Sequence, residues 1–161
     1  INRKGKCSVT VSTSTFVPKP HTPFEWFGQN TLDKIELKQQ FLKDKLKNKN
    51  IKYSWHNPMV SRLEAVISRG DKFDSWEENL NLKAWEKAFE DTNIKPEEYA
   101  SKEYDLDYVF PWDNIIHGVE KSFLKREYKK ALKGETTKNC MQNCSACGVT
   151  KIAECKFAKK S

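Results

Sequence analysis

Four of the five cysteines in this chain lie close together, within the segment CMQNCSACGVTKIAEC. The first three follow the spacing CxxxCxxC, and a fourth can fold back to complete a set of thiolates: Cys140, Cys144, Cys147 and Cys155. Four thiolates suit either a tetrahedral zinc ion or an iron–sulfur cluster. Because only one CxxC pair is present, the paired CxxC signature of a zinc ribbon is not met. The segment therefore predicts metal or cluster binding, with redox-active or inert thiols as the alternatives.

The three histidines, His21, His56 and His117, are far apart in the sequence. No HxxxH or HExxH spacing links them, so each is expected to be a scattered structural residue rather than a metal ligand. The sequence also contains no GxGxxG motif and no P-loop. The cysteine segment is thus the strongest candidate for chemistry.

The chain of 161 residues carries 29 Lys and Arg against 22 Asp and Glu, a formal net charge of +7. Only four of the basic residues are arginines. A lysine excess indicates a solvated surface, because specific phosphate and base recognition favours the arginine fork. We therefore expect no DNA partner, and weak attraction to RNA is the polyanion interaction that stays open.

No apolar run approaches the roughly 18 residues of a membrane span, and no signal peptide opens the chain. The expected location is the cytoplasm, where thiols stay reduced and clustered cysteines bind metal more often than they form disulfides. The chain does not begin with Met and enters a strand pattern almost at once. This pattern predicts a fragment of a longer polypeptide.

The elements that must position these groups are expected to be mainly helical. Residues 7–16 alternate small or β-branched side chains and predict a strand, and Pro18, Pro20 and Pro23 predict an extended loop after it. A second short strand is expected at 51–55. Apolar spacing and cap residues predict helices at about 32–46, 58–70 and 82–92, a short helical turn from Pro96, and a last helix at about 119–132.

The clearest helix signal is HNPMVSRLEAVISRG. Asn57 can cap the helix, Pro58 suits its first position and Gly70 ends it. Its expected inward face consists of Val60, Leu63 and Ile67. For the later helices, the expected inward residues are Trp85 and Phe89, followed by Phe123, Leu124 and Tyr128.

A lone strand cannot satisfy its backbone donors and acceptors. We therefore expect the strand at 7–16 to pair with a strand outside this chain. Pairing with the strand at 51–55 is the alternative.

Four longer phrases carry a resemblance: VSTSTFVPKPHTPFEW, IKYSWHNPMVSRLEAVISRGD, KFDSWEENLNLKAWEKAFEDTNIKPEEYA and FPWDNIIHGVEKSFLKREYKKALKGETTKNC with the cysteines after it. In this order they resemble the C-terminal part of a bacterial family of radical S-adenosylmethionine (SAM) proteins with an N-terminal cobalamin-binding-like domain. The resemblance covers nearly the entire chain. Its most specific strings are FVPKPHTPF and the pair WHNP and SRGD.

The resemblance implies that the first strand is a late strand of a partial (β/α) barrel, and that the helices form a C-terminal extension packed on the upstream barrel of the same polypeptide. The loop PKPHTPF would then lie at the face where barrel enzymes hold substrate and cofactor. Lys19, His21 and Thr22 would border this mouth, with a structural proline-rich connector as the alternative. Second-tier candidates are Trp55, His56, Asn57, Arg69 and Asp71.

The resemblance also implies a [4Fe–4S] cluster and SAM, both bound upstream of this chain, whose reductive cleavage yields a 5′-deoxyadenosyl radical. Cobalamin is an open alternative as a further cofactor of the parent protein. The chain by itself is expected to be inactive. The CxxxCxxC spacing of the catalytic cluster recurs in the cysteine segment, but only fourteen residues follow Cys147, where the family has most of a barrel after its motif. We interpret this match as coincidental.

Two departures from the family pattern are visible. Asp71 runs directly into Lys72, where the family has a further helical stretch, so residues are expected to be missing or deleted there. Met141 follows Cys140, where the family usually has a basic residue. The second departure puts a role for charge at that position in doubt and leaves the thiols unaffected.

Three parts are therefore expected: a last barrel strand with its proline-rich loop (1–30), a helical extension (31–134) and a cysteine-rich metal-binding tail (135–161). The alternative from another class is a small basic helical module, held together by a four-thiolate zinc site, that binds RNA or a ribosomal partner. A third alternative is a structural extension with free, reduced cysteines.

Overall fold

The computed structural model describes residues 7–70 and 81–157 and divides into two compact units, 1–17 with 28–102 and 18–27 with 103–161. The first unit contains β1 (Val9–Thr13), α1 (Leu32–Lys45), β2 (Ile51–Trp55), α2 (Pro58–Arg69), α3 (Leu82–Asp91) and α4 (Pro96–Ala100). The second contains α5 (Lys121–Leu132) and a short 3-10 turn (Val149–Lys151). No helix within the described ranges has the length and apolar character to cross a membrane. The boundaries of these units do not coincide with the expected parts 1–30 and 31–134. The roles expected for those parts stay predictions.

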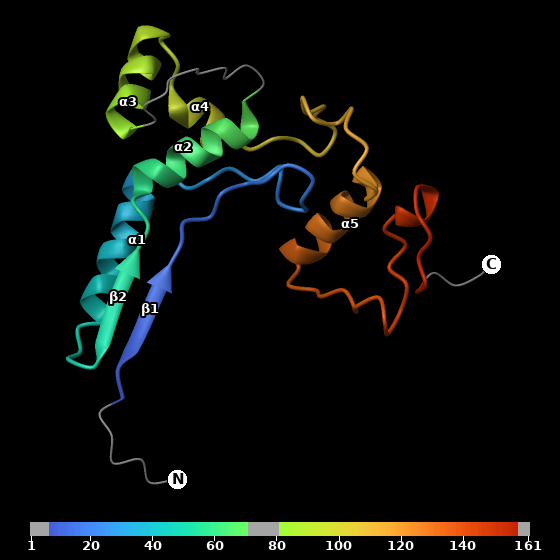
Figure 1. Ribbon diagram of the computed structural model, residues 1–161, viewed down its shortest axis with the longest axis horizontal. Coiled ribbons are helices and arrows are strands. Elements are labelled where there is room, and N and C mark those ends of the chain that lie inside the picture. The colour runs from blue at the N-terminus through green and yellow to red at the C-terminus, as the bar shows by residue number, and fades with distance from the viewer. Residues whose placement is uncertain (1–6, 71–80, 158–161) are drawn as a thin grey trace. The chain divides into compact units, whose positions relative to one another are not determined.

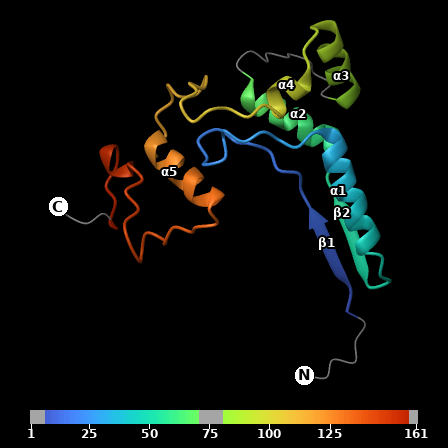
Figure 2. The same cartoon turned by 180° about the vertical axis from the view of Figure 1, so that it is seen from behind.

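In the first unit, β1 and β2 form a parallel two-stranded sheet, in a register that runs from Val9↔Ile51 to Thr13↔Trp55. The intervening helix α1 lies alongside β2 in both views (Figures 1 and 2). Parallel neighbours need a crossover of this kind, because a tight turn can join only antiparallel strands. We expected β1 to pair with a strand outside this chain. This expectation is wrong for one edge of β1, because β2 pairs with it there.

The other edge of β1 has no partner strand among the described residues. Val9 donates its N–H to the carbonyl of Asn50 at 2.8 Å, so the peptide groups of Val9 face β2. Because successive residues of a parallel strand direct their peptide groups to opposite edges, those of Thr10 and Ser12 face away from β2. The sheet is thus open for a further strand beside β1.

Helix α2 begins and ends where the sequence predicts. The side chain of Asn57 accepts the N–H of Met59 at 2.8 Å, and Pro58 occupies the first turn. At the other end, the N–H of Gly70 donates to the carbonyl of Val66 at 2.8 Å. These contacts satisfy orphan groups at both helix ends.

The buried face of α2 differs from the predicted one. Val60 and Ile67 are 52% and 47% exposed, and Leu63 is only partly buried. The buried residues are instead Ser61, Arg62, Ala65, Val66 and Arg69. The apolar spacing predicted the wrong buried face. The two arginines have hydrogen-bond partners inside the unit, so the side of the helix that carries them faces inward.

Those partners are backbone and hydroxyl oxygens. Arg62 donates to the hydroxyl of Ser101 at 2.6 Å and to the carbonyl of Asn30 at 2.8 Å. Arg69 places Nη1 2.5–3.3 Å from carbonyl oxygens at the end of α4 and just beyond it, those of Tyr99, Ala100 and Lys102. A buried guanidinium thereby ties α2 to a segment about thirty residues away.

Each unit has its own apolar core. In the first, Trp85 and Phe89 of α3 face inward as predicted and pack with Ala65, Val66 and Ala100. In the second, Leu124 of α5 is buried with Trp26, Phe110 and Trp112. Phe123 and Tyr128 pack against this second core and are partly buried, in agreement with the predicted face of the last helix.

Replacing Arg69 with Met should lower the free energy of unfolding of the first unit by about 2–4 kcal/mol, because the carbonyl oxygens around Nη1 lose a buried donor. The measurement is urea denaturation followed by circular dichroism. The matched control is Lys87→Met on the exposed side of α3, which should change stability by less than about 0.5 kcal/mol. Equal stability of the two variants would contradict a structural role for the arginine.

Candidate functional site

The proline-rich loop forms a compact turn around the three residues expected at the mouth of the site. The hydroxyl of Thr22 donates to the carbonyl of Lys19 at 2.8 Å. His21 has φ of 56°, in the left-handed region that non-glycine residues seldom adopt. Lys19 and Thr22 therefore shape the turn, and His21 is the member of the three that lines a pocket.

Glu25 holds this turn in place. Its side chain is buried, with 2% exposure, and its Oε2 accepts the backbone N–H of His21 at 2.8 Å. The same oxygen accepts the indole N–H of Trp112 at 3.0 Å. A buried carboxylate needs such donors, because an uncompensated charge away from water is strongly unfavourable. The contact joins the loop to the aromatic core of the second unit.

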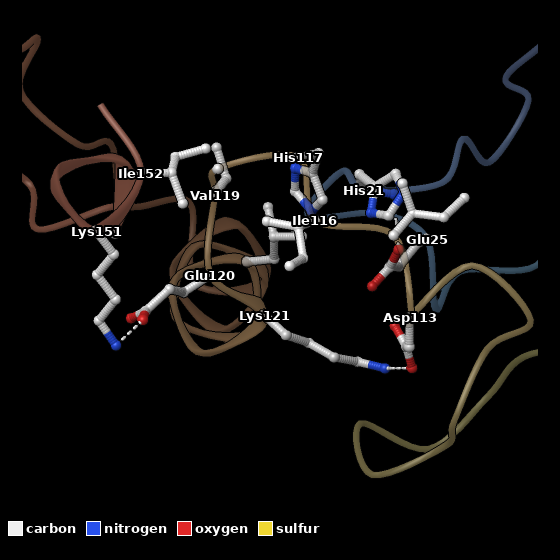
Figure 3. A pocket seen from close by; sticks show the side chains of 14 residues that line it. His21, Glu25, Asp113, Ile116, His117, Val119, Glu120, Lys121, Lys151 and Ile152 are labelled. Atoms are coloured by element: carbon white, nitrogen blue, oxygen red, sulfur yellow. Dashed lines mark hydrogen bonds and ion pairs between the residues drawn. The ribbon is translucent and has the colours of Figure 1, made fainter. Parts of the chain in front are cut away.

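The pocket has a volume of about 250 Å³ and lies in the second unit, between the loop, the start of α5 and the 3-10 turn. Figure 3 shows the imidazole rings of His21 and His117 facing each other at one end of it. Their ring centroids are 3.8 Å apart, and their planes are tilted by 43°. Two histidines that are 96 positions apart in the chain thus form one contact pair.

Two ion pairs line the rest of the pocket, Lys121 with Asp113 and Lys151 with Glu120 (Figure 3). Lys121 also lies over the rings of Phe110 and Trp26, 5.1 and 5.9 Å from their centroids. Apolar side chains complete the lining, among them Ile116, Val119, Leu124 and Ile152. The pocket therefore combines an apolar wall with internally compensated charges.

Burial and a neighbouring ring shift the pKa of the loop histidine downward. Burial lowers the pKa of His21 below its ordinary value of 6.5, and the neighbouring ring of His117 lowers it further. Glu25 and Asp113 act in the opposite direction and are outweighed. A neutral imidazole can accept a proton or a hydrogen bond near pH 7. The pair therefore suits a ligand with one polar group at the histidines and an apolar body against the isoleucines.

The cysteine segment forms another part of the pocket wall. Gly148 has φ of 98°, and a side chain at this position would collide with Glu120. The N–H of Glu120 donates to the carbonyl of Cys147 at 2.8 Å, and Arg126 donates to the carbonyl of Ser145. These contacts dock the CxxC turn on the beginning of α5. Turns of this kind direct successive N–H groups toward one point, as in sites for anions and clusters.

The four clustered thiols do not form one ligand set. Cys140 is exposed, and Cys144, Cys147 and Cys155 are partly buried as free thiols. Within the residues that the structure describes, no three His, Cys, Asp or Glu side chains are arranged to hold a common ion. Their donor chemistry suits zinc or iron–sulfur, so metal binding stays a prediction and would require the loop to close around the ion.

The second-tier candidates have structural contacts in the first unit. Trp55 stacks on Tyr53 with ring centroids 5.0 Å apart, and the carbonyl of His56 accepts from Gln39 at 3.1 Å. Asn57 caps α2, and Arg69, the last residue of α2, is buried and donates to carbonyl oxygens at the end of α4, as described above. Asp71 and its junction with Lys72 lie outside the described residues.

Sequence reasoning missed the residues that surround His21. His117 was expected to be a scattered residue, and neither Glu25 nor Trp112 was singled out. A signal for Glu25 was present, since a carboxylate between Phe24 and Trp26 in a proline-rich segment points to a buried anion. Nothing in the sequence indicates which distant residue meets it.

Replacing His117 with Ala should raise the pKa of His21, because two effects that lower it are removed, the coulombic interaction with the ring of His117 and part of the burial. The measurement is an NMR titration of the Cε1–H resonances, with His56→Ala in the first unit as the control. An unchanged titration of His21 in the His117 variant would show that the two rings do not interact in solution.

No family model, curated protein or solved structure matches this chain.

Proposed function

We propose that this chain is the C-terminal region of a radical SAM enzyme and continues its partial (β/α) barrel. The observation that carries the proposal is the β1–α1–β2 arrangement, in which two parallel strands are joined through a helix. A barrel of this class repeats that unit. The phrases that resemble the family supply the assignment to radical SAM chemistry.

The open edge of β1 supports the same proposal. An isolated pair of strands is marginal in water, and parallel sheets are normally built from several strands. The peptide groups of Thr10 and Ser12 face away from β2 and can pair with a preceding barrel strand. A larger sheet would also cover part of Val9, which is 49% exposed here.

At the end of β1, a hollow of about 310 Å³ adds a feature typical of such barrels. Its lining comes from Thr13 to Phe16 and from the α1 residues Ile35, Lys38 and Gln39, among others. Ligands of α/β proteins gather at the carboxyl ends of parallel strands. We propose that this end of the sheet faces the substrate in the complete barrel.

In this proposal the [4Fe–4S] cluster and SAM are held by residues outside this chain, and when bound they supply a 5′-deoxyadenosyl radical. This chain contributes substrate contacts and excludes water, and alone it is inactive. In the second unit, His21, in the turn shaped by Lys19 and Thr22, lines a pocket of its own, where an imidazole with a lowered pKa can accept a hydrogen bond from a polar group of a ligand. Cobalamin in the parent and a cytoplasmic location belong to the same proposal.

We further propose that Cys140, Cys144, Cys147 and Cys155 bind zinc or an iron–sulfur cluster. Support comes from four thiols within one short segment and from the left-handed turns at Ala146 and Gly148. Binding would draw the thiols together, as is common where ligands are assembled by the ion itself.

The barrel proposal is tested by Thr10→Pro in the full-length protein that contains this chain. Proline removes the N–H on the open edge and leaves the edge toward β2 intact, so 5′-deoxyadenosine formation from SAM with dithionite should fall to background. Thr10→Val, which keeps the N–H, is the control and should retain activity. A wild-type protein that never cleaves SAM would overturn the family assignment. Full activity of the proline variant would overturn the edge pairing alone.

Metal binding is tested by metal analysis and visible spectra after purification without oxygen. We expect either about one zinc per chain in colourless protein, or iron with sulfide in brown protein. Cys144→Ser should lose most of this metal, whereas Cys7→Ser, which lies outside the cluster, should keep it. If the wild-type protein contains no metal, the metal-binding proposal is wrong and the four residues are free cysteines.

A further inference from the structure

The charges of the second unit are segregated along the chain. From Glu103 to Glu120 there are five acidic residues and no Lys or Arg, whereas from Lys121 to Lys138 there are seven basic and two acidic residues. The basic run covers α5 and the segment that follows it. Because a run of like charge is often only a solvated face, its geometry decides whether it binds a partner.

The basic side chains line two neighbouring hollows. The first has a volume of about 490 Å³ and is lined by Lys125, Arg126, Lys129, Lys130 and Lys133 together with Ser122 and one carboxylate, that of Glu135. The second, of about 340 Å³, contains Arg126, Lys130 and Lys138 with the polar groups of Thr136, Asn143 and Ser145. Arg126 and Lys130 line both hollows, so the two hollows adjoin; we call them together the α5 groove.

Part of this charge is not neutralised inside the protein. Lys125 pairs with Asp107 at 2.8 Å and Lys130 with Glu127 at 3.2 Å. Within the described part of the chain, no ion pair engages Lys129, Lys133 or Lys138, which are exposed. Unpaired like charges along one helix repel each other, and a polyanion in the groove would relieve that repulsion.

We propose that the α5 groove binds the sugar–phosphate backbone of single-stranded RNA. The cations line a concave surface, which suits a strand that follows a groove. A membrane surface fits less well, because the apolar side of α5 is packed into the core of its own unit and leaves no face to insert. An acidic peptide offers carboxylates but no ribose for the polar groups beside the cations.

Those polar groups favour RNA over DNA. Thr136 and Ser122 carry hydroxyls and Asn143 an amide, and each can both donate to and accept from a ribose 2′-hydroxyl. The lining of the groove contains no aromatic side chain on which a base could stack. Binding should therefore depend on the backbone and show little preference for base sequence.

The proposal does not rest on the radical SAM assignment, since it concerns α5 and requires no cofactor. Its test is fluorescence anisotropy of the full chain with a labelled RNA of about twelve uridines, a length within the usual range for single-strand sites, at several KCl concentrations. Each lysine contact with a phosphate contributes about 0.7 to the slope of log affinity against log salt. Wild-type protein should bind with a clear salt dependence.

The diagnostic variant is Lys129→Gln with Lys133→Gln, which removes two unpaired cations from the groove. Its affinity should fall about tenfold, and its salt slope should become shallower by about 1.4. The matched control is Lys83→Gln with Lys87→Gln on α3, which makes the same charge change at the same helical spacing outside the groove. The control should bind RNA nearly as well as wild type, and circular dichroism should confirm that both variants are folded.

Several results would overturn the proposal. These are no RNA binding at low salt, an equal loss of affinity in the control variant, and equally tight binding of DNA of matched length. Displacement of the RNA by anionic phospholipid vesicles or by polyglutamate at equal charge concentration would assign the groove to a different partner and equally reject RNA.

Discussion

The arrangement of the second unit depends on the hydrogen bonds that the buried carboxylate of Glu25 accepts. It accepts the backbone N–H of His21 and the indole N–H of Trp112, which lies 87 positions further along the chain. One oxygen therefore fixes the left-handed turn of the proline-rich loop to the aromatic core. The loop in turn sets the ring of His21 against His117, so the pocket inherits its geometry from this anion.

The first unit uses the same kind of device with other groups. Gln29 is buried, and its side-chain amide donates to the carbonyls of Phe16 and Ser61 at 3.0 Å each. In a similar way, Arg62 joins α2 to Asn30 and Ser101, and Arg69 joins it to the end of α4. In both units, a few buried polar side chains hold in place loops that lack the regular backbone hydrogen bonds of a helix or sheet. Such contacts are costly to leave unmade, so they specify one arrangement of the chain.

Local signals made the secondary structure predictable. Asn57, Pro58 and Gly70 marked α2, and the spacing of Trp85 and Phe89 marked the buried face of α3. The inward face of α2 was not predictable. A charged arginine is expected at the surface unless its hydrogen-bond acceptors are known, and here those acceptors are distant in the sequence. The contact between His21 and His117 was not predictable for the same reason. The two histidines are 96 positions apart, so no helical or strand periodicity links them. Parallel pairing of β1 with β2 was visible only as an alternative, since sequence alone does not rank two candidate partners.

The open edge of β1 has a consequence for contacts between copies of this chain. A row of unsatisfied peptide groups is a template on which another copy can add its own strand. At high concentration, copies of the chain can associate through backbone pairing at this edge, against the repulsion that their net charge of +7 provides. This open edge spans the five residues of β1, so pairing between copies would involve only a short stretch of backbone.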